Sequence, residues 1–160
     1  MAYGSLSNSG WRIGPLSGIL HIMEFTEIQR QEIAKMAEKY GLSLVVLFGS
    51  QATGKTHAKS DIDIGVAKKT RSFFEEMDVP IIEIENELTD LLRRDDIEIV
   101  NLSAVSPALM RSVVEDGKPL YEETSGVFSD WKLFAARIWM ETGWLRERQR
   151  GNLKAWAKTL

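Results

Sequence analysis

Cysteine is absent from this chain of 160 residues, and only two histidines occur, His21 and His57. These shortages exclude disulfide bridges and thiolate zinc sites, and they argue against a histidine-rich metal site. No apolar run approaches the roughly 20 residues that a membrane-spanning helix needs, and no signal-peptide pattern opens the chain. The sequence therefore predicts a cytoplasmic protein without a membrane segment.

What is present is ordinary for one globular domain, with 44% apolar and 27% charged residues. Residues 1–22 are rich in glycine and serine without a clear period, which predicts a flexible tail. A well-formed helix signal follows Met23, so Met23 is a candidate natural start and residues 1–22 a candidate upstream extension. We expect residues 23–160 to form a single domain that ends in a long helix.

Charge is unevenly distributed along the chain. Between Glu75 and Glu123 acidic residues outnumber basic ones by 14 to 4, whereas from Trp131 to Leu160 basic residues outnumber acidic ones by 7 to 2. A basic tail can contact a phosphate or an acidic partner, and it can equally be the solvated face of a helix.

Hydrophobic periodicity predicts helices that alternate with short strands. Thr26 is a suitable N-cap for the first helix, which Gly41 ends, and Ser129 is a suitable N-cap for the last. Residues 49–59 have the composition of a polar loop. The order predicts an α/β (α+β) fold in which helices pack on a small mixed sheet. The expected strands span 43–48, 61–66, 96–102 and 119–121, and the expected helices span 26–41, 78–94, 106–117 and 129 onward.

Two interpretations compete for residues 47–63. Gly49 to Thr56 match the P-loop pattern G-x-x-x-x-G-K-[ST] at every required position, after an apolar strand. A P-loop needs a helix that begins at the Lys-Thr pair, so that its N-terminus faces the phosphates. Only four residues separate Thr56 from the strand pattern that begins at Asp61, which leaves no room for that helix.

The second interpretation uses Gly49 and Ser50 together with Asp61 and Asp63. The two aspartates are two residues apart on a strand, so their carboxylates point to one face, repel each other and favour a cation between them. Carboxylate oxygens suit Mg²⁺, which commonly keeps triphosphate oxygens among its ligands. Gly49 lets the backbone approach a phosphate, and Ser50 offers an N–H and a hydroxyl. The plainer alternative is a surface hairpin whose aspartates face water, but aspartate is depleted in strands.

The stretch Leu-Phe-Gly-Ser-x-Ala-x-Gly, followed by Ser-Asp-Ile-Asp-Ile, resembles the minimal nucleotidyltransferases of the DNA polymerase beta superfamily. The resemblance covers about residues 26–150 and implies the fold of that superfamily for a single nucleotidyltransferase domain. The residues in register are Gly49, Ser50, Ala52, Gly54, Ser60, Asp61 and Asp63.

The resemblance also implies a third carboxylate on a neighbouring strand. Family members usually read Val-Asp-Leu-Val-Asp-Leu where this chain reads Ile-Glu-Ile-Val-Asn-Leu from Ile97, so Glu98 takes the place of the usual aspartate. Asp96 lies on the same face of the strand and competes with Glu98 for this role. Members often carry arginines at the positions of Gln51 and Thr53, and Lys55 or Lys59 could supply that charge.

In chemical terms the resemblance implies two Mg²⁺ ions held by Asp61, Asp63 and Glu98, with ATP as the substrate bound at Gly49 and Ser50. AMP would pass from ATP to a hydroxyl of another molecule, and pyrophosphate would leave. Minimal members are commonly antitoxins paired with HEPN-domain toxins, and some transfer AMP to a toxin tyrosine. The resemblance therefore implies a HEPN-type toxin as partner in a hetero-oligomer.

Another kind of function stays open at this point. The chain could neutralise its partner by binding alone, as a catalytically weak antitoxin. Trp144 and Trp156, set among basic residues of the last helix, are the interface candidates. Direct nucleic-acid binding is not expected, because the tail has no recognised RNA-binding pattern.

Overall fold

The computed structural model describes residues 23–54, 61–69 and 78–158. Its centre is the buried strand β1 (Leu42–Phe48), which is flanked by the antiparallel strands β2 (Ile62–Lys68) and β4 (Lys118–Glu122). Strand β3 (Ile97–Asn101) pairs parallel to β2, so the sheet order is β3-β2-β1-β4. This mixed sheet confirms the predicted fold class, and each strand lies within two residues of its predicted bounds.

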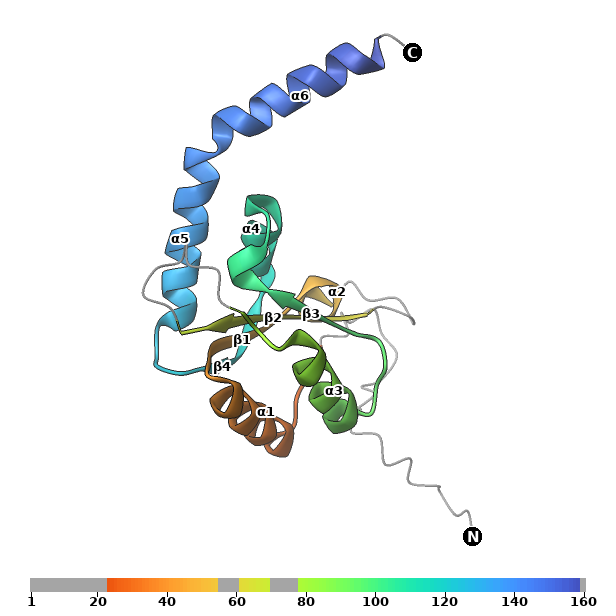
Figure 1. Cartoon of the computed structure of the whole chain (residues 1–160), viewed down its shortest axis with the longest axis vertical. Coiled ribbons are helices and arrows are strands. Elements are labelled where there is room, and N and C mark those ends of the chain that lie inside the picture. The colour runs from red at the N-terminus through yellow and green to blue at the C-terminus, as the bar shows by residue number, and fades with distance from the viewer. Residues whose placement is uncertain (1–22, 55–60, 70–77, 159–160) are drawn as a thin grey trace.

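Helices cover both faces of the sheet (Figure 1). One face packs on α1 (Glu27–Tyr40) and α3 (Ile81–Leu92), and the other packs on α4 (Pro107–Asp116) and α5 (Val127–Glu141). Successive side chains of a strand point to opposite faces, so the apolar run of β1 fills two cores. Val45 and Leu47 join the core of α1 and α3, whereas Leu44 and Val46 join the core of α4 and α5.

The first helix begins and ends where the sequence predicts. The Thr26 hydroxyl accepts a hydrogen bond from the Gln29 N–H (3.2 Å), and the Gln29 side chain accepts one from the Thr26 N–H (2.9 Å), which completes a capping box. Gly41 ends the helix in the left-handed conformation, with φ of 64°. These local signals need no tertiary context, which is why they could be read directly.

Two local predictions are wrong. Residues 49–53 form a short helix, α2 (Gly49–Thr53), in place of the start of a polar loop, because the Thr53 hydroxyl donates back to the Gly49 carbonyl (3.2 Å) and Ala52 is buried. A helix this short shows no period in a sequence. Ser129 lies inside α5, whose N-cap is Gly126, and the Phe128 N–H instead donates to the Glu122 carboxylate (2.9 Å).

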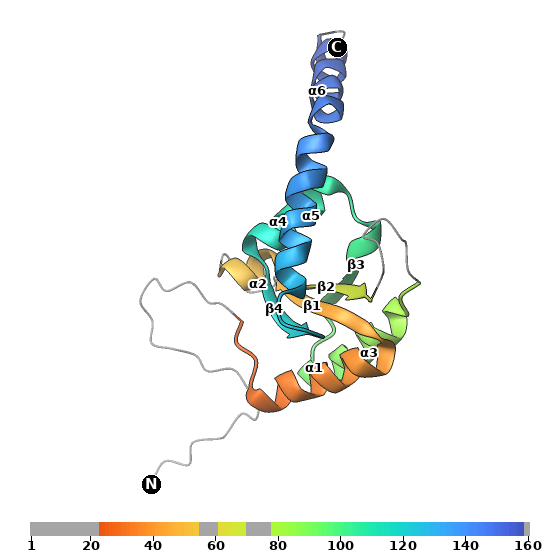
Figure 2. The same cartoon turned by 90° about the vertical axis from the view of Figure 1, so that its left-hand side faces the viewer.

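The long C-terminal helical segment is present, but it consists of two helices. After α5 the chain bends at Thr142 into α6 (Gly143–Ala157). Elsewhere, a one-turn 3-10 helix, η1 (Leu102–Ala104), follows β3. The Thr142 hydroxyl donates to the Ile138 carbonyl (2.6 Å), and the Arg146 guanidinium donates to Thr142 (2.7 Å) and to the Trp139 carbonyl (2.6 Å). Helix α6 extends away from the body and buries none of its residues (Figures 1 and 2).

Some of the sequence predictions concern residues outside the described ranges. The expected tail, residues 1–22, and the two loop lysines, Lys55 and Lys59, lie outside the described residues. No helix in the described ranges combines the length and apolarity that crossing a membrane requires.

Candidate functional site

The predicted site residues gather at one edge of the sheet, where β1 ends and β2 and β3 begin. Phe48, the last residue of β1, pairs with Asp63 of β2, and Asp63 pairs in turn with Glu98 of β3. Gly49 follows Phe48 directly, and Asp61 immediately precedes β2. The strand register therefore brings together groups that are up to 49 residues apart in the chain.

Gly49 and Asp63 are in direct contact. A Cβ atom added at Gly49 would lie 2.1 Å from Oδ2 of Asp63, and Gly49 has φ of 71°, a conformation that other L-residues rarely adopt. The contact therefore requires glycine for two reasons, space and backbone conformation. It places a bare backbone against the carboxylate, and the binding of a phosphate at this turn stays a prediction. Ser50 is the second residue of α2, and its side chain lies at an intermediate depth.

The electrostatics of Asp63 differ from those of an ordinary surface aspartate. Partial burial raises the pKa of Asp63 above its usual value, and the nearby charges of Glu98 and Asp61 raise this pKa further. Glu98 and Asp61 are exposed. Because like charges crowd a half-buried carboxylate, a bound cation would stabilise this edge.

Asp96, the competitor of Glu98, is already engaged. The Arg94 guanidinium forms an ion pair with both carboxylate oxygens of Asp96. This contact lowers the pKa of Asp96 below its usual value. A carboxylate held by an arginine is a poorer metal ligand than one that faces other carboxylates, so the geometry favours Glu98 as the third acidic group.

The chemistry of these residues suits a divalent cation, but the residues do not form a complete coordination shell. Within the described ranges, no group of three or more His, Asp or Glu side chains already has the arrangement of a metal site. Mg²⁺ usually keeps waters and substrate phosphates in its shell and takes one or two carboxylates from the protein. The mutual repulsion at Asp63 and the open edge therefore suit a cation that arrives together with a nucleotide.

Gln51 and Thr53, where the family resemblance leads us to expect arginines, have structural roles here. The Gln51 side chain is buried, and the Gln51 carbonyl accepts a hydrogen bond from the Met23 N–H (3.1 Å). The Thr53 hydroxyl donates to backbone carbonyls of its own helix. Neither side chain carries the positive charge that an arginine would bring to a phosphate. Helix α2 also occupies the residues that would form the loop of a P-loop, so the P-loop interpretation does not fit the fold.

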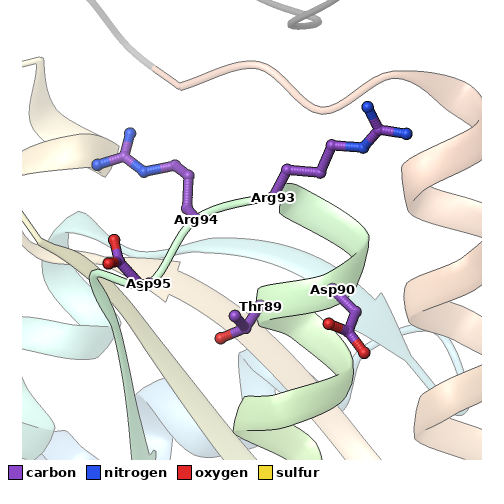
Figure 3. A pocket seen from close by; sticks show the side chains of 5 residues that line it. All are labelled: Thr89, Asp90, Arg93, Arg94 and Asp95. Carbon is purple, nitrogen blue, oxygen red and sulfur yellow. The ribbon is translucent and has the colours of Figure 1, made fainter.

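Sequence reasoning missed Arg94. It lies in the turn between α3 and β3, where it lines a shallow pocket of about 450 Å³ that opens to solvent (Figure 3). No periodicity marks a residue in such a turn, and the only signal was its spacing of two from Asp96. The residues lining the pocket are Thr89, Asp90, Arg93, Arg94 and Asp95.

The aromatic residues of the C-terminal helices divide into two groups. Trp131 is buried, and the guanidinium groups of Arg111 and Arg146 lie over the ring of Trp139, 4.5 Å and 3.4 Å from its centroid. Trp144 and Trp156 of α6 are 66% and 62% exposed. Their role at an interface stays a prediction.

Comparison with known proteins supports the class that this site indicates. Residues 31–125 match the family model described as polymerase beta, nucleotidyltransferase. The chain belongs to this family of nucleotidyltransferases.

The relatives are protein-modifying enzymes. The protein adenylyltransferase MntA of Aphanizomenon flos-aquae is 31% identical over 116 residues, which are 69% of this chain and 75% of that protein. A crystal structure of a toxin-antitoxin with AMP-PNP has a TM-score of 0.64 at 24% identity, over 78% of this chain and 98% of the matched chain. A structure of a tri-AMPylated Shewanella oneidensis HEPN toxin in complex with MNT antitoxin has a TM-score of 0.60 at 22% identity. The match covers 80% of this chain and 98% of the matched chain. At such identities the two structures support the fold alone.

Proposed function

We propose that this chain is a Mg²⁺-dependent protein adenylyltransferase that moves AMP from ATP to a hydroxyl of a partner protein. The observation that supports this most directly is the edge where Asp63 faces Glu98 and Asp61 while its carboxylate touches the bare backbone of Gly49. Acidic groups crowded in this way destabilise a fold unless they bind cations. The family membership and the adenylyltransferase relative point to the same chemistry.

Each residue has a distinct role in this proposal. Asp61 and Asp63 hold the metal ions, Glu98 completes the metal site on the acceptor side, and Gly49 and Ser50 receive the triphosphate through backbone N–H groups and the Ser50 hydroxyl. When bound, two Mg²⁺ ions lower the pKa of the acceptor hydroxyl and neutralise the charge of the leaving pyrophosphate. The chain's own contribution is to align these groups on two paired strands.

The transfer conserves atoms and charge. The acceptor oxygen forms a bond to the α-phosphorus, the bond from this phosphorus to the oxygen bridging to the β-phosphorus breaks, and pyrophosphate leaves. Glu98 takes the acceptor proton and later releases it to solvent. A tyrosine acceptor, whose free pKa is about 10, needs such help at neutral pH.

One structural neighbour is a tri-AMPylated HEPN toxin in complex with an antitoxin. We therefore propose that the acceptor is a HEPN-domain toxin and that this chain is the antitoxin of a hetero-oligomeric toxin–antitoxin pair. The test is incubation of the purified chain with the HEPN-domain partner, Mg²⁺ and ATP labelled at the α-phosphate. We expect label on a tyrosine of the partner, found by mass spectrometry of its peptides. An unlabelled partner would overturn the proposed transfer.

A second candidate function is neutralisation by binding alone. The exposed α6 offers a docking element. The buried Gln51, and Thr53 with its hydroxyl bonded to its own helix, bring no positive charge to a phosphate. Both observations favour this second function. The double variant Asp61→Asn, Asp63→Asn separates the two functions in cells that express the toxin. A pure binder would still protect these cells, whereas an adenylyltransferase would lose its protection.

A further inference from the structure

The pocket described above lies beside the proposed catalytic carboxylates but contains none of them. Arg94 connects the two places, because it lines the pocket and pairs with Asp96. The chain then enters β3, where the Asp96 carbonyl accepts a hydrogen bond from the Ile62 N–H (2.8 Å) and Glu98 pairs with Asp63. The pocket and the carboxylates therefore share one edge of the sheet.

The in-line geometry of the transfer determines whether ATP or the acceptor lies next to this pocket. Gly49, the proposed triphosphate turn, lies on the β1 side of Asp63, and the pocket belongs to the segment that enters β3, on the other side. In phosphoryl transfer the attacking and leaving oxygens lie roughly in line. Pyrophosphate that leaves on the β1 side requires an acceptor that approaches from the β3 side, next to the pocket.

Arg93 is the residue of the pocket best suited to contact that acceptor. Its side chain is exposed, and within the described part of the chain no carboxylate forms an ion pair with it. It is also the C-cap of α3 in the left-handed conformation, with φ of 53°, where glycine would be the unstrained choice. In Figure 3 the guanidinium groups of Arg93 and Arg94 point to opposite sides of the turn, and the carboxylate of Asp90 lies below Arg93.

The lining side chains indicate the kind of ligand. Two arginines and two aspartates give the pocket no net charge, which does not suit a small free anion. A protein segment with hydrogen-bonding groups and its own charged side chains suits such a mixed lining, and an exposed guanidinium favours a carboxylate as its contact.

Building on the adenylyltransferase function proposed above, we propose that this pocket binds the segment of the acceptor protein that carries the reacting hydroxyl. Arg93 is a specificity-determining residue that pairs with a carboxylate of this segment. The nucleotide does not enter the pocket.

The test compares the wild type with Arg93→Glu and Arg93→Gly in AMP transfer to the HEPN-domain acceptor. Arg93→Gly removes the guanidinium and relieves the left-handed backbone, so a loss of function in this variant does not reflect unfolding. The control is Lys69→Glu, an equal change of charge at the far end of β2, where Lys69 is 75% exposed and pairs with Glu123 (2.8 Å). Such an exposed pair contributes little to stability.

We expect Arg93→Glu to raise the acceptor KM by about tenfold or more and Arg93→Gly by about threefold to tenfold, with kcat and the KM for ATP unchanged. Lys69→Glu should match the wild type. An unchanged acceptor KM, or a changed KM for ATP, would overturn the proposal. It would also be overturned if Arg93→Gly slowed only the second and later transfers, since the contact would then be the phosphodiester of a nucleotide already attached.

A separate measurement keeps this proposal distinct from the proposed function. If the wild type transfers no AMP, the adenylyltransferase function fails, and binding of the acceptor without ATP then tests the pocket. A Kd weakened about tenfold by Arg93→Glu, and unchanged by Lys69→Glu, would support the pocket as an acceptor site. Equal affinities for all three proteins would reject it.

Discussion

Two charged regions of this molecule are built in opposite ways. At the sheet edge, Asp63 is half-buried beside Glu98 and Asp61, and the pKa of Asp63 is raised. Between α1 and α3, the Glu87 carboxylate accepts hydrogen bonds from the Lys39 ammonium and the Tyr40 hydroxyl. These two contacts lower the pKa of Glu87.

The difference shows which region serves the fold and which serves the chemistry. Opposite charges and donors satisfy Glu87 within the chain, so its ionised form stabilises the folded state. The ionised form of Asp63 destabilises the folded state until a cation binds, and the fold tolerates this because two cores hold the strands in register. A region that opposes stability while its neighbours support it is typical of a functional site.

The largest effect is expected at Asp63. Asp63→Asn should lower AMP transfer by about a thousandfold or more, because the metal and charge balance at the transferring phosphate is lost. The same substitution should raise the melting temperature of the metal-free protein at pH 7, because it removes a raised-pKa carboxylate. Thermal unfolding should also show that Mg²⁺ with a non-hydrolysable ATP analogue stabilises the wild type and not the variant. Asp116→Asn, at an exposed residue on α4, is the control.

A comparison of Glu98→Gln with Asp96→Asn assigns the third carboxylate. Glu98→Gln should reduce kcat by about a hundredfold with little loss of stability, since Glu98 is exposed. Asp96→Asn should reduce kcat far less and should destabilise the fold, because it leaves Arg94 without its ion pair to Asp96. If Asp96→Asn caused the larger loss of kcat, Asp96 would be the ligand and the assignment to Glu98 would be wrong.

Gly49→Ala probes the contact between the turn and the carboxylate. Both Gly49→Ala and Gly41→Ala place a side chain at positive φ, 71° and 64°, which costs roughly 1–2 kcal/mol. Only at Gly49 does the new Cβ meet Asp63, whereas nothing lies within 4 Å at Gly41. We therefore expect a loss of stability by urea denaturation that is at least as large for Gly49→Ala as for Gly41→Ala, and a loss of transfer, about tenfold to a hundredfold, for Gly49→Ala alone. Equal activity of the two variants would show that the contact has no functional role.

The smallest effect is expected at Glu87 and appears in the pH dependence of stability. The pKa of Glu87 is lower in the folded chain than its ordinary value of 4.5, so its contribution is fully present above pH 4.5 and is lost as the pH falls through the folded pKa. Glu87→Gln should lower the melting temperature slightly at pH 7 and should flatten its fall below pH 4.5. Parallel curves for the variant and the wild type would contradict the lowered pKa. AMP transfer should not change.

The sequence predicted those parts of the site that depend on residues close together in the chain. The alternation of Asp61 and Asp63 with isoleucines, and the apolar run before Gly49, indicated two strands and an acidic edge because strand periodicity is a local property. The choice between Glu98 and Asp96 could not be made locally, because the predicted strand placed both on the same face, whereas β3 begins only at Ile97. It depended on Arg94, which the turn before β3 brings to Asp96.

The sequence by itself determined the four strands, the caps of α1 and the candidate residues of the site, because each is specified by neighbours in the chain. Only the tertiary structure decided which acidic groups meet, that Gly49 lies against Asp63, and that Arg93 stands at a pocket beside them. It also decided that the C-terminal segment bends at Thr142, where Arg146 holds the last turn of α5. The physical reason is that register, burial and charge contacts join residues far apart in the chain, and no local pattern encodes those distances.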